Sequence, residues 1–248
     1  MIVDSVAIPD GLCKALAEDR LVVFAGAGVS MQGESPLPPF ADLVRQIGRS
    51  LDPLNKCKIL NSDADGCEAS LGRLSEMGDI HGSCASIIGG AKGFSNLHAN
   101  ILSLFGKSER VRVVTTNFDL RFNGAAEFLG LKPRVYQCPA LPLGNDFNGI
   151  VYLHGNTLHP SETVLSDVDF GKAYISNGWA SRFLVDMFSA YTVLFVGYSC
   201  GDMMVKYLAR SLSADVRGKA YVLEIDDAQF GKWKSLGVEP IRFDAYGQ

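Results

Sequence analysis

Long uncharged apolar runs are missing from this sequence. A membrane-spanning helix needs about 20 consecutive apolar residues, whereas the longest apolar run, at 191–200, is shorter and better suits a buried strand. Residues 1–12 also lack the basic segment followed by an apolar stretch that marks a signal peptide. We therefore expect no membrane partner and a cytoplasmic location.

The cysteines lack the spacing of a metal site. The six cysteines, at 13, 57, 67, 84, 138 and 200, form no C-x-x-C pair, and no neighbouring histidine completes a zinc pattern. We expect reduced thiols that mostly act as small buried apolar side chains, and no bound metal.

An excess of positive charge is also absent. The chain carries 23 lysines and arginines against 27 aspartates and glutamates, and it contains no basic run. Because a nucleic-acid backbone is bound by a basic face, we expect no direct nucleic-acid binding. The 248 residues, 47% of them hydrophobic, fit one large globular domain.

Residues 52–93 differ from the rest of the chain in composition. They are rich in Gly, Ser, Asp and Cys, and their hydrophobic periodicity is weak. We interpret residues 1–248 as a single domain in which 52–93 form a small inserted helical lobe or lid. A looser linker is the alternative.

Short apolar runs rich in β-branched residues predict the strands. They lie at 21–25, 111–115, 150–153, 193–196, 220–223 and 241–243. Four of them lack the alternation of a half-exposed strand, and such continuous runs are typical of parallel strands buried on both faces.

Helical patterns fall between these runs. Apolar residues recur at helical spacing in 10–18, where Asp10 can cap the helix, and in 40–51, 97–105, 120–129, 181–190 and 203–212. Alternating strands and helices predict an α/β fold with a doubly wound, mostly parallel, Rossmann-like sheet and a small helical insertion.

A glycine-rich segment follows the first of these strands. Residues 26–30 read GAGVS, and glycines at a strand's carboxyl end let the backbone approach a phosphate with free N–H groups facing the anion. Gly26, Ala27, Gly28 and Ser30 are therefore candidate nucleotide-binding residues. The third glycine of the dinucleotide fingerprint is replaced by Met31, so a plain tight turn is an equal alternative.

Polar residues follow two further strands. After 111–115 come Thr116, Asn117 and Asp119; the amide of Asn117 offers a donor and an acceptor, and Asp119 can cap the next helix. His154 follows 150–153 with Gly155 beside it, and a histidine there can act as a general base. A lone histidine is more often structural, and we assign that role to the histidines at 81, 98 and 159.

Two more strand ends carry candidate ligand groups. Gly197 and Ser199 close the strand at 193–196, before Asp202 at a helix start, and fit a second phosphate or the adenine ribose. Glu224 ends the strand at 220–223, where a carboxylate can bind both hydroxyls of a ribose. A solvated loop charge is an equal alternative for Glu224.

From about residue 20 to residue 243 these motifs together resemble the sirtuin superfamily. GAGVS at 26–30 resembles its phosphate loop, TTNFD at 115–119 resembles T-Q-N-I-D, and Gly197-Tyr198-Ser199 resembles G-T-S. His154 in LHG stands at the position of the catalytic histidine. The resemblance implies NAD as the substrate, with Asn117, His154 and Asp119 as catalytic residues.

Three departures from the family pattern indicate which sirtuin-like proteins the chain resembles. Only Cys200 follows His154, so the four-cysteine zinc module of deacylating sirtuins is absent. Thr116 replaces a glutamine, and GESPLPPF at 33–40, where we expect Phe40 to contact the nucleotide, does not reproduce G-I-P-D-F-R. The chain thus resembles bacterial sirtuin-like NAD hydrolases, effector domains of anti-phage systems that are commonly fused to, or bound by, a sensor module.

The resemblance implies an NAD⁺ glycohydrolase that releases nicotinamide and ADP-ribose, or its cyclic form. We expect the pyrophosphate to rest on residues 26–30 beside Thr116, and the adenosine end to lie near Gly197, Ser199 and Glu224. Asn117 then holds the nicotinamide ribose or the attacking water, His154 accepts a proton, and Asp119 orients its neighbours or meets the nicotinamide.

Two alternatives remain open at this point. One is an NAD-dependent protein deacylase, and the other is a non-catalytic module that senses NAD or ADP-ribose. We further expect a homo-oligomer, or a regulatory sensor module on another chain or segment, because uncontrolled NAD⁺ hydrolysis would kill the host.

Overall fold

The core of the computed structural model is one seven-stranded sheet. The structure describes residues 2–3, 6–33, 35–52, 66–91, 93–199 and 220–243. The sheet order is β5-β6-β4-β3-β7-β8-β9, and every neighbouring pair is parallel. The strands are β3 (Leu21–Ala25), β4 (Arg112–Thr115), β5 (Val135–Gln137), β6 (Gly149–Tyr152), β7 (Thr192–Val196), β8 (Ala220–Glu224) and β9 (Glu239–Arg242).

The strand order reverses at β3. After β3 the chain adds β4, β5 and β6 on one side, with β6 between β4 and β5, and it then returns to place β7, β8 and β9 on the other. In doubly wound folds the crevice at such a reversal is where ligands bind. The predicted α/β fold class is therefore confirmed, and GAGVS, which follows β3, lies at the reversal.

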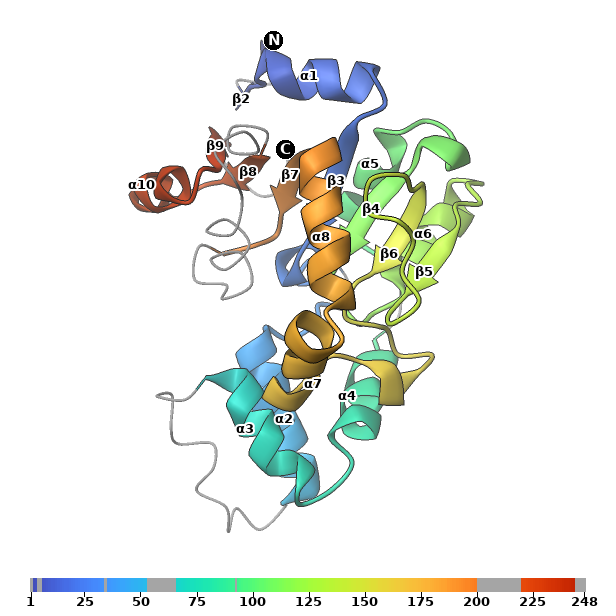
Figure 1. The fold of residues 1–248 in the computed structure, drawn as a ribbon, viewed down its shortest axis with the longest axis vertical. Helices are drawn as coiled ribbons and strands as arrows, with labels where there is room; N and C mark the ends of the chain where they lie inside the picture. The colour runs from blue at the N-terminus through green and yellow to red at the C-terminus, as the bar shows by residue number, and fades with distance from the viewer. Residues whose placement is uncertain are drawn as a thin grey trace.

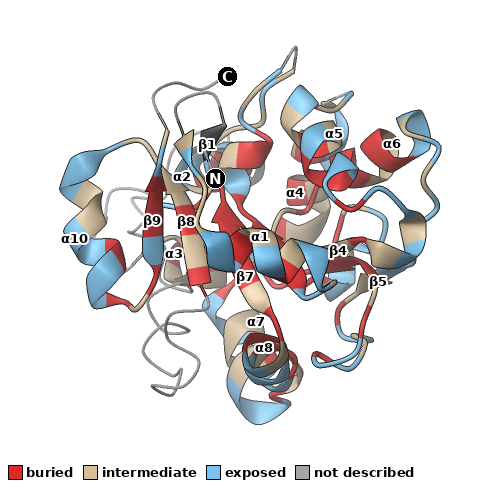
Figure 2. Cartoon of the chain, turned by 90° about the horizontal axis from the view of Figure 1, so that it is seen from above, coloured by how far each residue is buried: buried red, intermediate tan, exposed pale blue. Residues whose placement is uncertain are grey.

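The strands have helices on both faces because their side chains are apolar on both sides. Every residue of β3 and β6 is buried. Val22 and Phe24 pack into a core with α8 (Trp179–Ala190) and Trp233 of α10 (Asp227–Ser235). Leu21 and Val23 pack into another core with α1 (Asp10–Ala17), α5 (Asn96–Ser103) and α6 (Arg121–Phe128). Figure 2 shows α5 and α6 on one side of the strands and α7 and α8 on the other.

Several predicted elements differ from the structure in detail. Pro9 occupies the N-cap of α1 and Asp10 is its first residue, so Asp10 contributes charge to the first turn instead of capping the helix. The sequence did not predict β5 or α10, nor the short antiparallel pair of β1 (Ile2–Val3) and β2 (Val6–Ala7). The predicted helix at 203–212 lies outside the described residues.

A group of helices lies below the carboxyl ends of the strands in Figure 1. The helices α2 (Phe40–Leu51), α3 (Cys67–Ser75) and α4 (Ile80–Gly89) share a third core that includes Ile47, Leu71 and Ile80 and also Phe118 from the β4–α6 connection. We call α2, α3 and α4 the helical lobe. The predicted insertion at 52–93 contains α3 and α4, its residues 53–65 and 92 lie outside the described residues, and its role as a lid stays a prediction.

A further segment, α7 (Asp167–Gly171) followed by the π-helical turn η5 (Lys172–Ser176), runs between the lobe and α8. None of the helices that the structure describes has both the length and the apolar character of a bilayer-spanning segment.

Candidate functional site

A cavity of about 760 Å³ lies where the carboxyl ends of the central strands meet the helical lobe. Its size is within the usual range of small-molecule sites, roughly 300–1,000 Å³. The lobe, α7, η5 and α8 contribute its largely apolar walls. The candidate site residues that line it are Ala27, Ser30, Phe40, Thr116, Asn117, Asp119 and His154.

The sheet register places Asn117 and His154 at the same distance beyond the carboxyl edge of the sheet. Thr115 of β4 pairs with Tyr152 of β6, and the ladder continues through a 2.9 Å bond from the Leu153 N–H to the Thr115 carbonyl. Asn117 and His154 each lie two positions beyond this pair, on neighbouring strands that are about 4.8 Å apart. Both side chains line the same cavity.

The amide of Asn117 has a fixed orientation. Its Nδ2 group donates to the Gly26 carbonyl at 3.0 Å and to Ser30 Oγ at 3.1 Å. A carbonyl oxygen can only accept, so the nitrogen end of the amide must face Gly26. With Nδ2 committed to these two oxygens, Oδ1 is the end of the amide that remains for a ligand.

Asp119 is largely buried and is bonded to Ser30. The Ser30 hydroxyl donates to Asp119 Oδ2 at 2.8 Å, and the Arg121 backbone N–H donates to Oδ1 at 3.1 Å. The second bond lies just before α6, whose N-cap is Leu120, so Asp119 bonds to the first helical N–H from one residue outside the predicted cap position. Burial raises the pKa of Asp119, and the bonds from Ser30 and Arg121 oppose that rise.

His154 is buried beneath two aromatic rings. Its Nε2 lies 2.8 Å from the Tyr174 hydroxyl, and the Phe170 ring meets the imidazole edge to face at 5.1 Å. Phe170 of α7 and Tyr174 of η5 stack on each other. Desolvation lowers the pKa of His154 to about 3, so the imidazole is neutral at pH 7. π-Helical turns such as η5 are frequent at functional sites.

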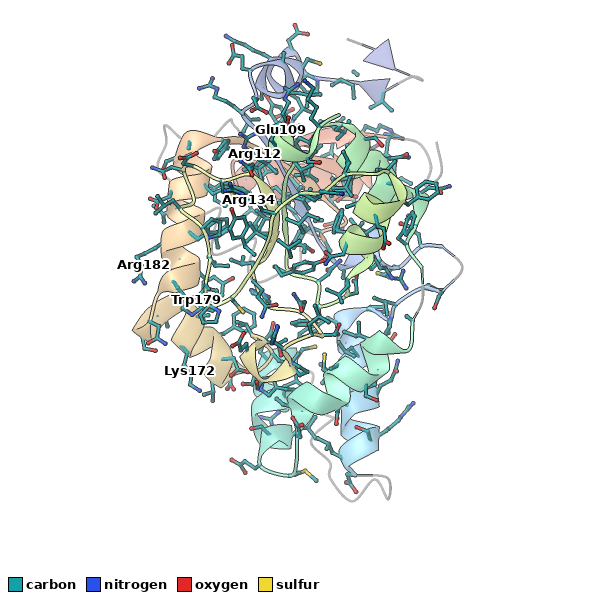
Figure 3. All side chains as sticks on the ribbon, turned by 90° about the vertical axis from the view of Figure 1, so that its right-hand side faces the viewer. Glu109, Arg112, Arg134, Lys172, Trp179 and Arg182 are labelled. Atoms are coloured by element: carbon teal, nitrogen blue, oxygen red, sulfur yellow. The ribbon has the colours of Figure 1, made fainter. Side chains whose placement is uncertain are left out.

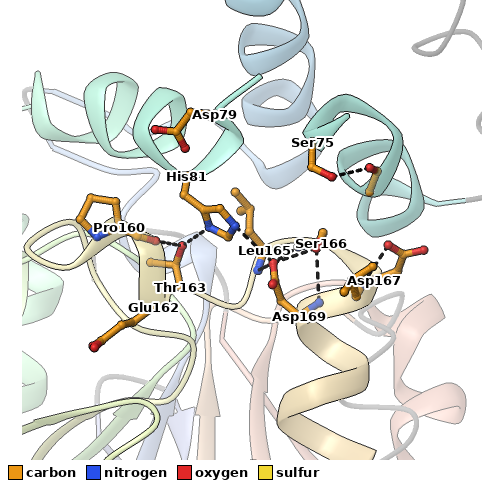
Figure 4. Close-up of polar contacts among 12 residues, drawn as sticks. Ser75, Asp79, His81, Pro160, Glu162, Thr163, Leu165, Ser166, Asp167 and Asp169 are labelled. Carbon is orange, nitrogen blue, oxygen red and sulfur yellow. Dashed lines mark hydrogen bonds and ion pairs between the residues drawn. The ribbon is translucent and has the colours of Figure 1, made fainter. Parts of the chain in front are cut away.

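The helical lobe is tied to the segment that covers His154. Figure 4 shows His81 of α4 between Thr163 and Asp169: its Nδ1 lies 2.9 Å from Thr163 Oγ1, and its Nε2 lies 3.6 Å from Asp169 Oδ2. Asp169 also accepts from the N–H and hydroxyl of Ser166 at the start of α7. The helical lobe and α7, which both line the cavity, are thus joined to each other through the contacts of His81.

The glycines of GAGVS are needed for close packing between two loops. The Gly28 N–H donates to the Gly197 carbonyl at 2.9 Å, and a Cβ on Gly28 would lie 2.8 Å from the Gly197 Cα. The expectation that this loop presents free N–H groups to a phosphate is wrong for four of its residues. The N–H groups of Gly26, Gly28, Val29 and Ser30 all donate to carbonyls within the protein, because the loop after β3 packs against the loop after β7 and turns into a short 3₁₀ helix.

Gly197 gives a direct test of this packing. It has φ of +73°, and a Cβ there would lie 2.6 Å from the Val29 nitrogen. We expect Gly197→Ala to lower the free energy of unfolding by roughly 1–3 kcal/mol, as measured by urea denaturation. Gly106 has φ of +68° with no atom within 4 Å of such a Cβ. Gly106→Ala should therefore cost less, and equal losses would contradict the packing role.

Three predicted adenosine ligands do not line the cavity in this structure. Gly197, Ser199 and Glu224 are not among the lining residues. The carboxylate of Glu224 accepts from the N–H groups of Ile225 and Asp226, and from Trp233 Nε1 at 2.8 Å. Glu224 thus organises the start of α10 in this structure, and its contact with a ribose stays a prediction, as do the contacts of Gly197 and Ser199.

Sequence reasoning missed several residues of the site. Arg121 reaches from α6 to the Ser30 carbonyl, and its Nη2 also donates to the Ser35 carbonyl. Tyr174 and Phe170 cover His154, and His98, which we had treated as structural, lies 3.2 Å from Ser30 Oγ. The Ser95-x-x-His98 spacing of a capping box was visible in the sequence, whereas the contact with Ser30 was not.

The two buried histidines predict sensitivity to acid. Burial is the main cause that lowers the pKa of His98 from 6.5 to about 4 and that of His154 to about 3. Below about pH 6.5 the unfolded chain therefore binds more protons than the folded one, and the free energy of unfolding falls toward pH 4. Each histidine contributes up to about 1.4 kcal/mol per pH unit.

Urea denaturation between pH 7 and pH 5 measures this loss, to which Asp119 contributes in the opposite sense because its pKa is raised. His98→Gln should reduce the pH dependence, and replacement of the exposed His159 by Gln should not. An unchanged slope in His98→Gln would contradict a neutral, buried His98.

The described residues contain no group of three or more His, Cys, Asp or Glu side chains placed to hold a metal ion. Residues 111–241 match the family model described as the SIR2-like domain. The chain is also similar to the uncharacterized protein y4cA of Sinorhizobium fredii, with 28% identity over 96% of this chain. The match spans only 22% of that relative's length.

Proposed function

Because the chain belongs to the SIR2-like domain family, whose members are generally NAD-dependent enzymes, we propose that it is an NAD⁺ hydrolase. It breaks the bond between nicotinamide and ribose and releases nicotinamide and ADP-ribose, in linear or cyclic form. The observation that carries this proposal is the meeting of Asn117 and His154 in one cavity at neighbouring strand ends.

The reaction needs stabilisation of positive charge and a place for a proton. When the glycosidic C–N bond breaks, its electron pair leaves with nicotinamide and the ribose becomes oxocarbenium-like. The carbonyl end of the Asn117 amide orients the attacking water or a ribose hydroxyl, and its dipole faces the positive ribose. For the linear product, water forms the new C–O bond and His154 accepts the proton that this step releases. For the cyclic product, a nitrogen of the adenine takes the place of water as the nucleophile.

The charges around the cavity suit the nicotinamide ribose. Its lining includes the acidic residues Glu68, Asp119 and Asp167, and the described residues contribute no lysine or arginine to it. Figure 3 shows Arg112 at the end of the sheet remote from the lobe, where it pairs with Asp19, and Arg182 pointing outward from α8. An acidic wall favours the cationic nicotinamide end. We expect the pyrophosphate beside residues 26–30, although four of the five N–H groups there are already bonded within the protein.

A loss-of-NAD⁺ assay tests the proposal. Purified protein is incubated with NAD⁺ alone and with NAD⁺ plus an acyl-lysine peptide, and nicotinamide is measured by chromatography. We expect equal nicotinamide release in both reactions. Release that requires the peptide would favour a deacylase, and ADP-ribose binding without turnover would favour a sensor module.

We further propose that the domain is an NAD-depleting effector of anti-phage defence, held inactive until a partner or self-assembly activates it. The support is the resemblance to such effector domains, together with the covered state of His154 under Phe170 and Tyr174. Specific activity measured over a dilution series tests self-assembly. Equal specific activity at all concentrations would overturn that part of the proposal.

A further inference from the structure

His98 lies in α5 and does not contact any expected ligand; it packs behind residues 26–30, which we call the catalytic loop. Its side chain is fully buried, and its ring meets Phe122 of α6 edge to face at 4.8 Å. It does not line the cavity. Even so, its Nε2 lies 3.2 Å from Ser30 Oγ, although the two residues are 68 positions apart.

The surroundings of His98 fix its tautomer. The backbone N–H of Ser95 donates to Nδ1 at 3.2 Å. The Ser95 hydroxyl lies 2.8 Å from the same nitrogen and 3.2 Å from the Val29 carbonyl, so its one proton has two possible acceptors. A backbone N–H can only donate, and the Ser95 N–H therefore makes Nδ1 an acceptor without a proton. Burial and then the charge of Arg121 lower the pKa of His98 to about 4, so the ring is neutral at pH 7. The single ring proton must reside on Nε2, which donates to Ser30 Oγ.

This donation completes the hydrogen bonding of the Ser30 hydroxyl. A hydroxyl has one proton and two acceptor positions. The proton of Ser30 goes to Asp119 Oδ2 at 2.8 Å, and the oxygen accepts from Asn117 Nδ2 at 3.1 Å and from His98 Nε2 at 3.2 Å. Each bond directs the next, because His98 can only donate to this oxygen and the Asp119 carboxylate can only accept from it.

We propose that His98 is a positioning residue for the NAD⁺ reaction: through Ser30 it holds the Asn117 amide with its carbonyl end toward the reacting centre. This inference rests on the proposed function. The rate of the chemical step then depends partly on His98, although His98 touches neither the substrate nor the reacting atoms. Without the donor on Nε2, the Ser30 oxygen keeps its bonds to Asp119 and Asn117 but loses the third bond that fixes its position. The contact between Ser30 and Asn117 is then less well defined, and the Asn117 amide is held less firmly.

Two substitutions separate this role from a purely structural one. In His98→Asn the side-chain carbonyl can replace Nδ1 and accept from Ser95, but the amide does not reach Ser30. In His98→Gln the amide reaches as far as Nε2 and can donate to Ser30, while the bond from Ser95 is lost. The first variant thus keeps the helix cap, and the second keeps the contact with the catalytic loop.

We expect His98→Asn to lose more activity than His98→Gln, and His98→Gln to lose more stability than His98→Asn. His98→Asn should lower kcat about 10- to 100-fold, as expected for a misplaced catalytic group, with KM little changed and a higher melting temperature than His98→Gln. His98→Gln should keep kcat near the wild-type value. A kcat of His98→Asn equal to that of wild type would overturn the proposal, and so would losses of kcat in the two variants that follow their losses of stability.

A measurement without turnover keeps this test separate from the proposed function. Nitrogen NMR of the histidines in the full chain at pH 7 should show His98 with its proton on Nε2. A proton on Nδ1 would overturn the His98 proposal even if NAD⁺ is hydrolysed. Absence of NAD⁺ hydrolysis by the wild-type protein under every condition would instead overturn the proposed function, and the role of His98 in that reaction with it.

Discussion

Replacing Asn117 with alanine should reduce NAD⁺ hydrolysis on the order of 10²-fold or more while the protein stays folded. The substitution removes the amide carbonyl that orients the water or the ribose hydroxyl. It also removes two hydrogen bonds, to the Gly26 carbonyl and to Ser30 Oγ, at about 1 kcal/mol each. Nicotinamide release and circular dichroism of the same preparation measure the two effects.

Asn123→Ala is the matched control for this variant. Asn123 of α6 accepts a 2.8 Å bond from the Tyr152 hydroxyl and does not line the cavity. Its replacement also removes an amide and a partly buried hydrogen bond, so stability should fall while turnover is retained. Full turnover in Asn117→Ala, or an equal loss in Asn123→Ala, would refute the assignment of Asn117.

Replacing His154 with alanine should lower NAD⁺ hydrolysis by roughly 10²- to 10⁴-fold, the usual contribution of a general base. The imidazole is neutral at pH 7, but a pKa of about 3 makes it a weak base while Phe170 and Tyr174 cover it. Its pKa should rise toward its ordinary value once substrate displaces the Tyr174 hydroxyl and water enters. The pH profile of kcat should therefore show an acidic limb in the wild type that His154→Ala lacks.

Tyr174→Phe distinguishes the base from the group that covers it. This variant removes the hydroxyl that contacts Nε2 at 2.8 Å and keeps the ring that stacks on Phe170. We expect its turnover to equal or exceed that of the wild type, because the contact occupies the base. A loss as large as that of His154→Ala would transfer the catalytic role to Tyr174.

Strand ends were the most predictable part of this protein. A continuous apolar run such as LVVFA at 21–25, rich in β-branched residues and followed by glycines, is typical of a strand buried on both faces, and β3 has those bounds in the structure. Polar residues directly after such runs must reach the carboxyl edge of the sheet, which is how Asn117 and His154 could be identified. The edge strand β5 escaped prediction because it is three residues long and exposes Val135.

Contacts between distant segments were beyond sequence reasoning. Nothing near Glu224 in the chain indicates that Trp233 donates to its carboxylate, so the sequence could not predict the contribution of Glu224 to the start of α10. His98 was predicted to be structural because it does not follow a predicted strand, as His154 does. The contact of His98 with Ser30 depends on how α5 packs against β3 and α6, which only the assembled core determines.

The most direct test of the account is a crystal structure of His154→Ala with NAD⁺ bound. The account predicts the nicotinamide ribose between Asn117 and position 154, with the Asn117 carbonyl toward the ribose and the pyrophosphate near residues 26–30. A dinucleotide bound outside this cavity, or bound with its nicotinamide end away from Asn117, would contradict it.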